Sequence, residues 1–419
     1  DEIRADLASE QRMLRLVQGD VGSGKTVVAA LAIASVAETG RQSALMAPTE
    51  ILARQHYDRL TPTLASAGLR VALLTGRAKP SERAALHAAI GAGEVDVVIG
   101  THALVQSDLA FHDLGLAVVD EQHRFGVEQR LALGAKGNAV DVLVMTATPI
   151  PRTLALTAFG DMDCSALDEK PPGRTPISTR ALPAERIDEV VAGLQRALAE
   201  GARAYWVCPL VEENEELDLS AAQARHADLS KLFGAAVGLV HGRMKGGEKD
   251  AVMEAFQRGE VKILVATTVI EVGVDVPEAT IMVIEHAERF GLAQLHQLRG
   301  RVGRGSGKSS CLLLYKGPLS EAAKARLMII RQTEDGFRIA EEDLRLRGEG
   351  EILGVRQAGL PSFRLADLSA HARLLAVARD DAELILRRDP ELASDRGQAL
   401  RALLYLFERD DAVRLLRAG

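Results

Sequence analysis

The segment GDVGSGKT at residues 19–26 is the feature that most constrains how this chain can fold. It matches the pattern GxxxxGK(S/T), follows the apolar run LRLVQ and precedes residues 27–38, which have the pattern of a helix. In such a strand, loop and helix, glycines let backbone N–H groups close around phosphate oxygens at the helix N-terminus. We expect Lys25 to bind the β- and γ-phosphates and the Thr26 hydroxyl to bind Mg²⁺. The residues expected to hold a nucleotide are Gly19, Gly22, Ser23, Gly24, Lys25 and Thr26.

Short runs rich in valine, isoleucine and leucine alternate along the chain with longer segments that have helical patterns. Their hydrophobicity is continuous rather than alternating, which is typical of strands buried on both faces of a parallel sheet. The runs are residues 14–18, 43–47, 95–99, 116–119 and 142–145, and then 204–209, 237–241, 262–266, 280–284 and 310–315. Between the two sets, residues 168–179 contain three prolines, which leave no room for a helix or a central strand. We therefore predict an α/β protein with two parallel-sheet domains of similar size.

After about Gly317 the strand pattern stops, and the sequence becomes helical and charged. A glycine-rich loop is expected at residues 347–363, and the end of the chain has the pattern of small amphipathic helices. Because the chain opens on Asp1 rather than methionine, we expect it to be part of a longer protein. The predicted domains are a first α/β domain at residues 1–172, a second at 173–317, a helical hairpin and loop at 318–365, and a C-terminal helical segment at 366–419.

Composition argues against several classes of protein. The 51 Lys and Arg against 58 Asp and Glu give a formal charge of −7, and aromatic residues make up only 3%, which is unlike a basic nucleic-acid coat protein. The three cysteines lie far apart without a CxxC pair, which argues against a zinc site or a disulfide framework and fits a reducing cytoplasm. No apolar run approaches the roughly 18 residues of a membrane span, so we expect no membrane partner.

Two carboxylates stand at the end of an apolar run, in the segment LAVVDEQH. A nucleotide bound with Mg²⁺ needs a carboxylate for the metal and, if it is hydrolysed, a group that activates water. We expect Asp120 to bind the Mg²⁺ and Glu121 to orient the attacking water. The alternative is that the two acids are a solvated pair after an edge strand. The phosphate-binding pattern in the same chain favours the metal and water site over this alternative.

The segment QLRGRVGR at residues 297–304 concentrates arginine. Arginine pairs bidentately with phosphate oxygens and stays charged when desolvated, so this segment could complete a phosphate site across a cleft. Alone, such a cluster is more often a solvated or structural face. Residues 294–332 carry a local charge of +7, from the single acid Glu321 and the bases Arg299, Arg301, Arg304, Lys308, Lys316, Lys324, Arg326 and Arg331. A patch of this kind predicts salt-dependent binding to a phosphate backbone.

Several further motifs occur in the order found in superfamily 2 helicases. They are APTEILARQ at 47–55, GTHAL at 100–104, DEQHRFGVEQR at 120–130, TATPIPRTLA at 146–155, VHGRM at 240–244, ATTVIEVGVDVP at 266–277 and QLHQLRGRVGRG at 294–305. Together with LRLRGEGEILGVRQAGL at 344–360, they make the chain resemble the RecG family of DNA helicases along nearly its whole length. The resemblance implies two RecA-like P-loop domains with ATP in the cleft between them, followed by a helical hairpin and loop that move DNA.

The resemblance also assigns roles to single residues. Those implied to act in catalysis are Lys25, Asp120, Glu121, Gln297, Arg301 and Arg304. Gly273 and Asp275 would face the cleft near the ribose. The residues implied to couple the nucleotide state to DNA are Thr101, His102, Thr146, Thr148, Arg326, Arg347 and Gln357. Glu349 departs from the family, which usually has proline there, and we expect the family's amino-terminal wedge domain to be missing from this chain.

The resemblance thus implies an ATP-dependent translocase on double-stranded DNA that remodels branched DNA, such as stalled replication forks and Holliday-type junctions, in recombination and repair. ATP and Mg²⁺ would be its cofactors. It would be a cytoplasmic, nucleoid-associated monomer, with single-stranded DNA-binding protein as a further partner. One alternative is the translocase module of a transcription-repair coupling factor, which shares much of TATPIPRTLA and GLAQLHQLRGRVGRG. The other is a nucleotide-gated module that closes on DNA without net work.

Overall fold

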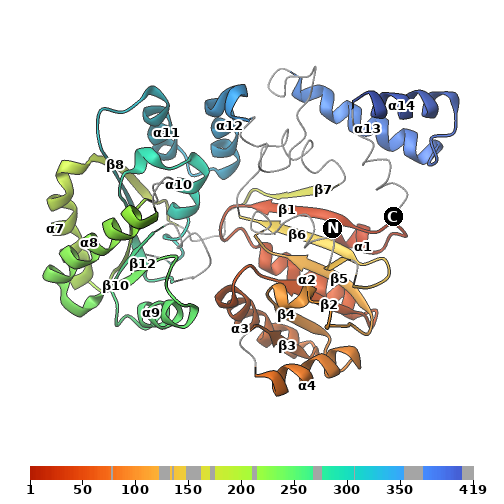
Figure 1. Ribbon diagram of the computed structural model, residues 1–419, viewed down its shortest axis with the longest axis horizontal. Helices are drawn as coiled ribbons and strands as arrows, with labels where there is room; N and C mark the ends of the chain where they lie inside the picture. The colour runs from red at the N-terminus through yellow and green to blue at the C-terminus, as the bar shows by residue number, and fades with distance from the viewer. Residues whose placement is uncertain are drawn as a thin grey trace. The chain divides into compact units, whose positions relative to one another are not determined.

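The structure is a computed structural model of the chain, and it describes residues 1–76, 79–121, 133–134, 136–147, 162–169, 175–209, 215–267, 276–305, 307–352 and 371–407. Backbone contacts divide the chain into two compact units. The first comprises Asp1–Ile150 and Asp163–Gly348, and the second comprises Pro151–Met162 and Glu349–Gly419. Two parallel sheets lie in the first unit, and α13 and α14 lie in the second (Figure 1).

Within the described residues, the first sheet has seven strands in the order β3-β4-β2-β5-β6-β1-β7, and all its pairings are parallel. The strands are β1 (Leu14–Gly19), β2 (Gln42–Met46), β3 (Val71–Leu74), β4 (Val97–Gly100), β5 (Leu114–Val119), β6 (Asp141–Thr146) and β7 (Asp163–Leu167). The helices are α1 (Glu2–Leu7), α2 (Lys25–Ala37), α3 (Glu50–Ser66), α4 (Pro80–Gly91) and the short η1 (His102–Val105). Val17, Leu45 and Val118 are fully buried, because helices cover the sheet and hide both faces of its strands.

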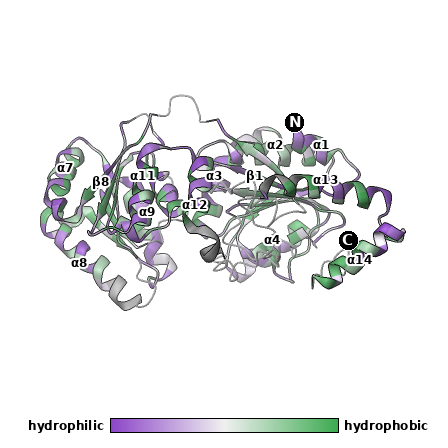
Figure 2. Cartoon of the chain, turned by 90° about the horizontal axis from the view of Figure 1, so that it is seen from above, coloured by the Kyte–Doolittle hydropathy of each residue, from purple (hydrophilic) through white to green (hydrophobic). Residues whose placement is uncertain are grey.

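The described part of residues 175–315 contains a second sheet, with six strands in the order β10-β11-β9-β12-β13-β8 and parallel pairings throughout. The strands are β8 (Ser178–Pro183), β9 (Arg203–Val207), β10 (Val237–Val240), β11 (Ile263–Ala266), β12 (Ala279–Ile284) and β13 (Ser310–Tyr315). The helices are α7 (Ile187–Ala199), α8 (Glu215–Phe233), α9 (Gly246–Arg258), α10 (Leu292–Arg299) and the short η3 (Ala184–Arg186), η4 (Gly234–Ala236) and η6 (Ala287–Arg289). Each turn of α7 carries hydrophilic and hydrophobic residues, as an amphipathic helix on a sheet should (Figure 2).

Two helices follow the second sheet, α11 (Glu321–Gln332) and α12 (Gly336–Ile352). The hydroxyl of Ser320 caps α11 by accepting a hydrogen bond from the Ala323 amide at 3.2 Å. Leu327 and Ile330 of α11 and Ile339 of α12 are buried in the same apolar cluster as α10 and β12. The α11–α12 hairpin is therefore packed on the second sheet domain.

The described part of the second unit contains α13 (Ala372–Arg388) and α14 (Asp395–Leu406). Ser394 caps α14 by accepting a hydrogen bond from the Gly397 amide at 3.1 Å, and Asp389 accepts one from the Ala393 amide at 2.7 Å. These two hydrogen bonds stabilise the turn between α13 and α14. In the described residues, no helix is both long and apolar enough to cross a membrane.

The predicted α/β architecture with two parallel sheets is confirmed, and each of the ten predicted strands is present within three residues of its expected bounds. Three strands were not predicted, β3, β7 and β8. All three are sheet edges, where burial is partial and the apolar pattern is weak. The expectation of a loop starting at residue 347 was wrong, because α12 continues to Ile352; leucine, arginine and glutamate favour a helix strongly enough to include two glycines. The predicted domain limits stay a prediction.

Candidate active site

The phosphate-binding pattern forms a tight loop between β1 and α2. Gly22 and Gly24 have positive φ angles of 83° and 97°, a backbone conformation that favours glycine. A Cβ on Gly19 would lie 2.6 Å from the Ser23 Oγ and 2.8 Å from the Leu167 carbonyl oxygen, so the strand end has no room for a side chain. The Ser23 Oγ is buried without a hydrogen-bond partner among the described residues. A cradle of this kind with a buried orphan hydroxyl fits a phosphate group.

The Lys25 ammonium lies inside this loop. Its Nζ donates hydrogen bonds to the Gly19 carbonyl oxygen at 2.6 Å and to the Asp20 carbonyl oxygen at 2.9 Å. Burial lowers the pKa of Lys25, and the charges of Asp120, Glu121 and Asp20 oppose that change while Arg304 adds to it. The Lys25 ammonium is thus a desolvated cation at the N-terminus of α2. Phosphate oxygens bind favourably to such a cation and to the free N–H groups of a helix N-terminus.

Asp120 follows β5 and is buried. Its Oδ2 lies 2.7 Å from the Nε2 of His56, and its Oδ1 accepts a hydrogen bond from the Glu121 amide at 3.0 Å. Burial would raise the pKa of Asp120, but the hydrogen bond and charge of His56, with the charge of Lys25, bring it below its usual value. An ionised carboxylate next to the phosphate loop can bind Mg²⁺ together with the Thr26 hydroxyl, which stands in the first turn of α2.

His56 was missed by sequence reasoning. It lies on α3, whose buried residues are Ala53, His56, Leu60 and Leu64. These positions recur at helical spacing, so His56 is a polar residue on the core-facing stripe of an amphipathic helix. A polar side chain on a core-facing stripe needs a buried hydrogen-bond partner. The position of His56 in the apolar pattern of residues 50–66 was therefore the signal that could have identified it.

Glu121 has a strained backbone, with a φ of 52° that is uncommon outside glycine. Burial raises the pKa of its carboxyl, and so does the nearby charge of Asp120, while Arg301, Lys25 and the Ala147 amide act in the opposite direction. A carboxylate with a raised pKa is a better proton acceptor near neutral pH. The two neighbouring acids therefore have different environments, as expected when one binds a cation and the other handles water.

The predicted arginine cluster separates into two kinds of residue. Arg301 is buried and its charge acts on Glu121, while the charge of Arg304 acts on Lys25 and its Nε donates to the Gly300 carbonyl oxygen at 3.2 Å. Arg299 instead points inward and is only 2% exposed. The structure thus places Arg304 near Lys25 and Arg301 near Glu121. It corrects the prediction of a basic patch over residues 294–332 in one respect, because the buried Arg299 cannot contribute to a DNA-binding surface.

The other predicted site residues have varied positions. Thr101 and Thr146 are buried at the ends of β4 and β6, the exposed His102 opens η1, and the half-buried Gln297 lies on α10. Arg326 of α11 donates a hydrogen bond from its Nη2 to the Glu288 carbonyl oxygen at 2.9 Å, which anchors the hairpin to η6. The backbone of Arg347 lies in α12. The residues that lie outside the described part of the chain are Thr148, Gly273, Asp275 and Gln357.

Three family models match the chain. The DEAD/DEAH box helicase model matches residues 3–157, and the helicase conserved C-terminal domain model matches residues 186–306. A third model, ATP-dependent DNA helicase RecG, domain 3, C-terminal, matches residues 333–405. The first match includes β1 to β6, the second includes β9 to β12, and the third includes α12, α13 and most of α14.

Curated relatives cover the chain almost completely. ATP-dependent DNA helicase RecG of Acidithiobacillus ferridurans is 56% identical over 391 residues, which are 93% of this chain and 57% of the relative. The protein of the same name in Bacillus subtilis is 49% identical over 408 residues, which are 96% of this chain and 60% of the relative. The chain therefore spans a little more than half the length of these relatives.

Solved structures give the same picture. The structure of RecG bound to a three-way DNA junction matches with a TM-score of 0.75 and 49% identity, over 89% of this chain and 49% of that one. Saccharomyces cerevisiae Dbp5 bound to RNA and ADP BeF3 matches with a TM-score of 0.55 and 15% identity, over 85% of this chain and 91% of that one. The second likeness shows a shared fold alone. Two RecA-like sheet domains, the predicted fold, are thus confirmed.

Proposed function

We propose that this chain, which belongs to the RecG family along the part that it spans, is the motor of an ATP-dependent helicase that translocates on double-stranded DNA. Its substrates would be branched DNAs such as stalled replication forks and Holliday-type junctions, in recombination and repair. One observation carries the proposal. Within one compact unit, the first sheet domain meets the second at the phosphate loop: the charge of Arg304 acts on Lys25, the charge of Arg301 acts on Glu121, and the Asp20 Oδ1 lies 3.1 Å from the His296 Nε2. A site built from two domains can turn hydrolysis into movement of one domain against the other.

The proposed reaction is hydrolysis of the γ-phosphate of ATP. The loop amides and Lys25 would bind the phosphates, and Thr26 and Asp120 would hold Mg²⁺, which when bound neutralises charge on the phosphate oxygens. Glu121 would orient a water molecule and accept its proton, a role that its raised pKa supports. Arg301 and Arg304 would stabilise the charge on the transferred phosphoryl group, a contribution of roughly 10³ to 10⁵ in rate for an arginine finger. Gln297, Gly273 and Asp275 would complete the nucleotide site.

Movement on DNA would follow from the hairpin. The α11–α12 hairpin packs on the second domain, so a change in the cleft can move it. The residues proposed to couple the nucleotide state to DNA are Thr101, His102, Thr146, Thr148, Arg326, Arg347 and Gln357. The proposed protein is a cytoplasmic, nucleoid-associated monomer that also contacts single-stranded DNA-binding protein.

The match to the RecG domain 3 model over residues 333–405 favours this function over a transcription-repair coupling factor. The test is ATP hydrolysis by the full-length protein, with and without branched duplex, for the wild type and Lys25→Ala. Lys231→Ala is a matched control, because Lys231 is an exposed lysine of α8 that pairs only with Asp228 among the bonds described. We expect turnover to be stimulated by branched DNA in the wild type and the control and to be lost in Lys25→Ala. Undiminished turnover in Lys25→Ala would refute the site assignment.

A further inference from the structure

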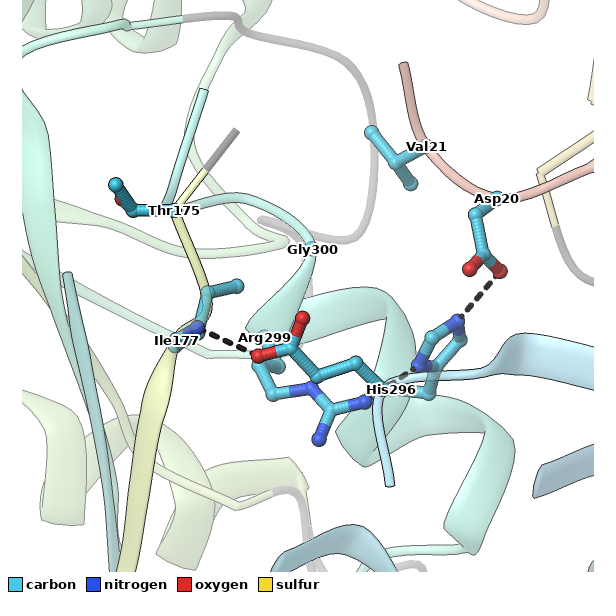
Figure 3. A pocket seen from close by; sticks show the side chains of 8 residues that line it. Asp20, Val21, Thr175, Ile177, His296, Arg299 and Gly300 are labelled. Carbon is cyan, nitrogen blue, oxygen red and sulfur yellow. Dashed lines mark hydrogen bonds and ion pairs between the residues drawn. The ribbon is translucent and has the colours of Figure 1, made fainter. Parts of the chain in front are cut away.

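The side chain of Asp20, in the phosphate loop, points toward His296 of α10 (Figure 3). Its Oδ1 lies 3.1 Å from the Nε2 of His296. Its Oδ2 accepts a hydrogen bond from the Gly336 amide at 3.4 Å. Gly336 is the first residue of α12. The Asp20 side chain of the phosphate loop therefore contacts both α10 and the α11–α12 hairpin.

The other ring nitrogen of His296, Nδ1, has a partner that determines the tautomer of the imidazole. The Arg299 Nη2 lies 3.0 Å from the His296 Nδ1. Because a guanidinium only donates, Nδ1 must accept, and the ring proton therefore sits on Nε2, which donates to Asp20. Arg299 thus orients the imidazole so that it can bond the phosphate loop.

Arg299 continues the connection to the hairpin. Its Nη1 donates hydrogen bonds to the Ile330 carbonyl oxygen at 2.5 Å and to the Thr333 carbonyl oxygen at 2.8 Å. Both carbonyls belong to the end of α11, where a helix leaves acceptors without intrahelical partners. In the turn that follows, Glu334 accepts a hydrogen bond from the Ile177 amide at 2.5 Å, close to the start of β8. The turn of the hairpin is therefore held from several sides.

The space among these residues is too small for a nucleotide. It measures about 30 Å³, and its lining includes Asp20, Val21, His296, Arg299 and Gly300. A Cβ on Gly300 would lie 3.2 Å from a Val21 methyl, so the backbone of the second domain passes tightly over the loop. The arrangement is a packed junction, where a displacement on one side is passed to the other.

We propose that Asp20, His296 and Arg299 form a relay that transmits the state of the phosphate loop to the α11–α12 hairpin. Asp20 and His296 are positioning residues that do not touch the reacting phosphate. The relay rests on the proposed function, because it gives the hairpin its signal in ATP-driven movement. Breaking it should leave hydrolysis active while fewer base pairs are travelled for each ATP consumed.

The test compares His296→Leu with His296→Gln in the full-length protein. A glutamine side chain can accept from Arg299 with its oxygen and donate to Asp20 with its nitrogen, whereas leucine can do neither. We measure ATP hydrolysis and displacement of a triplex-forming strand in the same reaction, and express the result as displacement per ATP. For His296→Leu we expect this ratio to fall at least tenfold, with hydrolysis within about threefold of the wild type. The His296→Gln variant should keep both values within about twofold.

A second readout needs no DNA. Hydrogen exchange at residues 330–340 is followed with and without a non-hydrolysable ATP analogue. We expect the analogue to change exchange there in the wild type and His296→Gln, and not in His296→Leu. The relay is refuted if His296→Leu keeps the wild-type exchange response, or if its hydrolysis and displacement fall in equal proportion. If the wild type itself displaces no strand, the proposed translocation fails, and the exchange response still decides whether the relay exists.

Discussion

The Nε2 of His56 lies 2.7 Å from the Oδ2 of Asp120, and both side chains are buried. Asp120 is ionised in this environment, so the imidazole donates and the carboxylate accepts. The hydrogen bond from His56 holds one carboxylate oxygen of Asp120, the proposed Mg²⁺ ligand, in place. Residues that hydrogen-bond to a metal ligand commonly orient it in this way.

Replacement of His56 by alanine leaves the Asp120 carboxylate buried without its donor. We expect a loss of about 1–3 kcal/mol in the free energy of unfolding and a rise in the Mg²⁺ concentration needed for half-maximal hydrolysis of about 10–100-fold. Chemical unfolding and a Mg²⁺ titration of the ATPase measure the two effects. His112→Ala, at an exposed histidine of the same domain, is the control. An unchanged Mg²⁺ requirement in His56→Ala would show that the bond does not position the ligand.

We expect the buried Glu121 carboxylate to lower the free energy of unfolding at neutral pH, although its proposed role is in catalysis. Its folded pKa is raised, so its protonated form is favoured on folding; the resulting stability is present at low pH and is lost as pH rises through the folded pKa. The neutral variant Glu121→Gln should therefore unfold roughly 2–4 °C higher than the wild type at pH 7.5, for a gain of about 1 kcal/mol. That advantage should shrink towards pH 5, while hydrolysis is lost. Thermal unfolding at both pH values checks the sign, and a destabilised Glu121→Gln would contradict it.

Arg301 is expected to act on both the phosphate and Glu121. Its removal in Arg301→Ala should lower the rate of hydrolysis by about 10³-fold or more, and Arg301→Lys should restore little, because an ammonium cannot pair bidentately. The pKa of Glu121 should rise further without Arg301, moving the acidic limb of the pH–rate profile to higher pH. Arg258→Ala, at an exposed arginine of α9, is the control. A normal rate in Arg301→Ala would exclude it from the site.

Gly19 has no space for a side chain, since a Cβ would meet the Leu167 carbonyl oxygen at 2.8 Å. Backbone atoms cannot move aside cheaply, so Gly19→Ala should cost roughly 1–3 kcal/mol of stability and weaken nucleotide binding. The matched change Gly193→Ala is on α7, where nothing lies within 4 Å, and it should stabilise by about 0.5–1 kcal/mol. Chemical unfolding and fluorescent-nucleotide titration distinguish them. Equal effects in the two variants would refute the steric argument.

Much of the fold followed from the sequence because buried parallel strands have continuous apolar patterns. The edge strand β8 escaped notice because its residues STRALP are half exposed and follow a proline-rich segment. In the candidate site, Lys25, Asp120 and Glu121 could be predicted from the sequence because the chemistry proposed for them requires residues at a fixed local spacing. His56, Asp20 and His296 were not, since their importance comes from partners 64 and 276 residues away in sequence. Arg299 was counted among the bases of a DNA-binding patch for the same reason: charge can be counted along a chain, but burial depends on the tertiary fold.

The proposed motor depends most on the coupling of ATP hydrolysis to movement on DNA. The most direct measurement is displacement of a triplex-forming strand from duplex DNA by the full-length protein, with ATP and with a non-hydrolysable analogue, for the wild type and Lys25→Ala. We predict displacement by the wild type with ATP alone, and none by Lys25→Ala with either nucleotide. Equal displacement with ATP and with the analogue, or by Lys25→Ala, would contradict a hydrolysis-driven translocase.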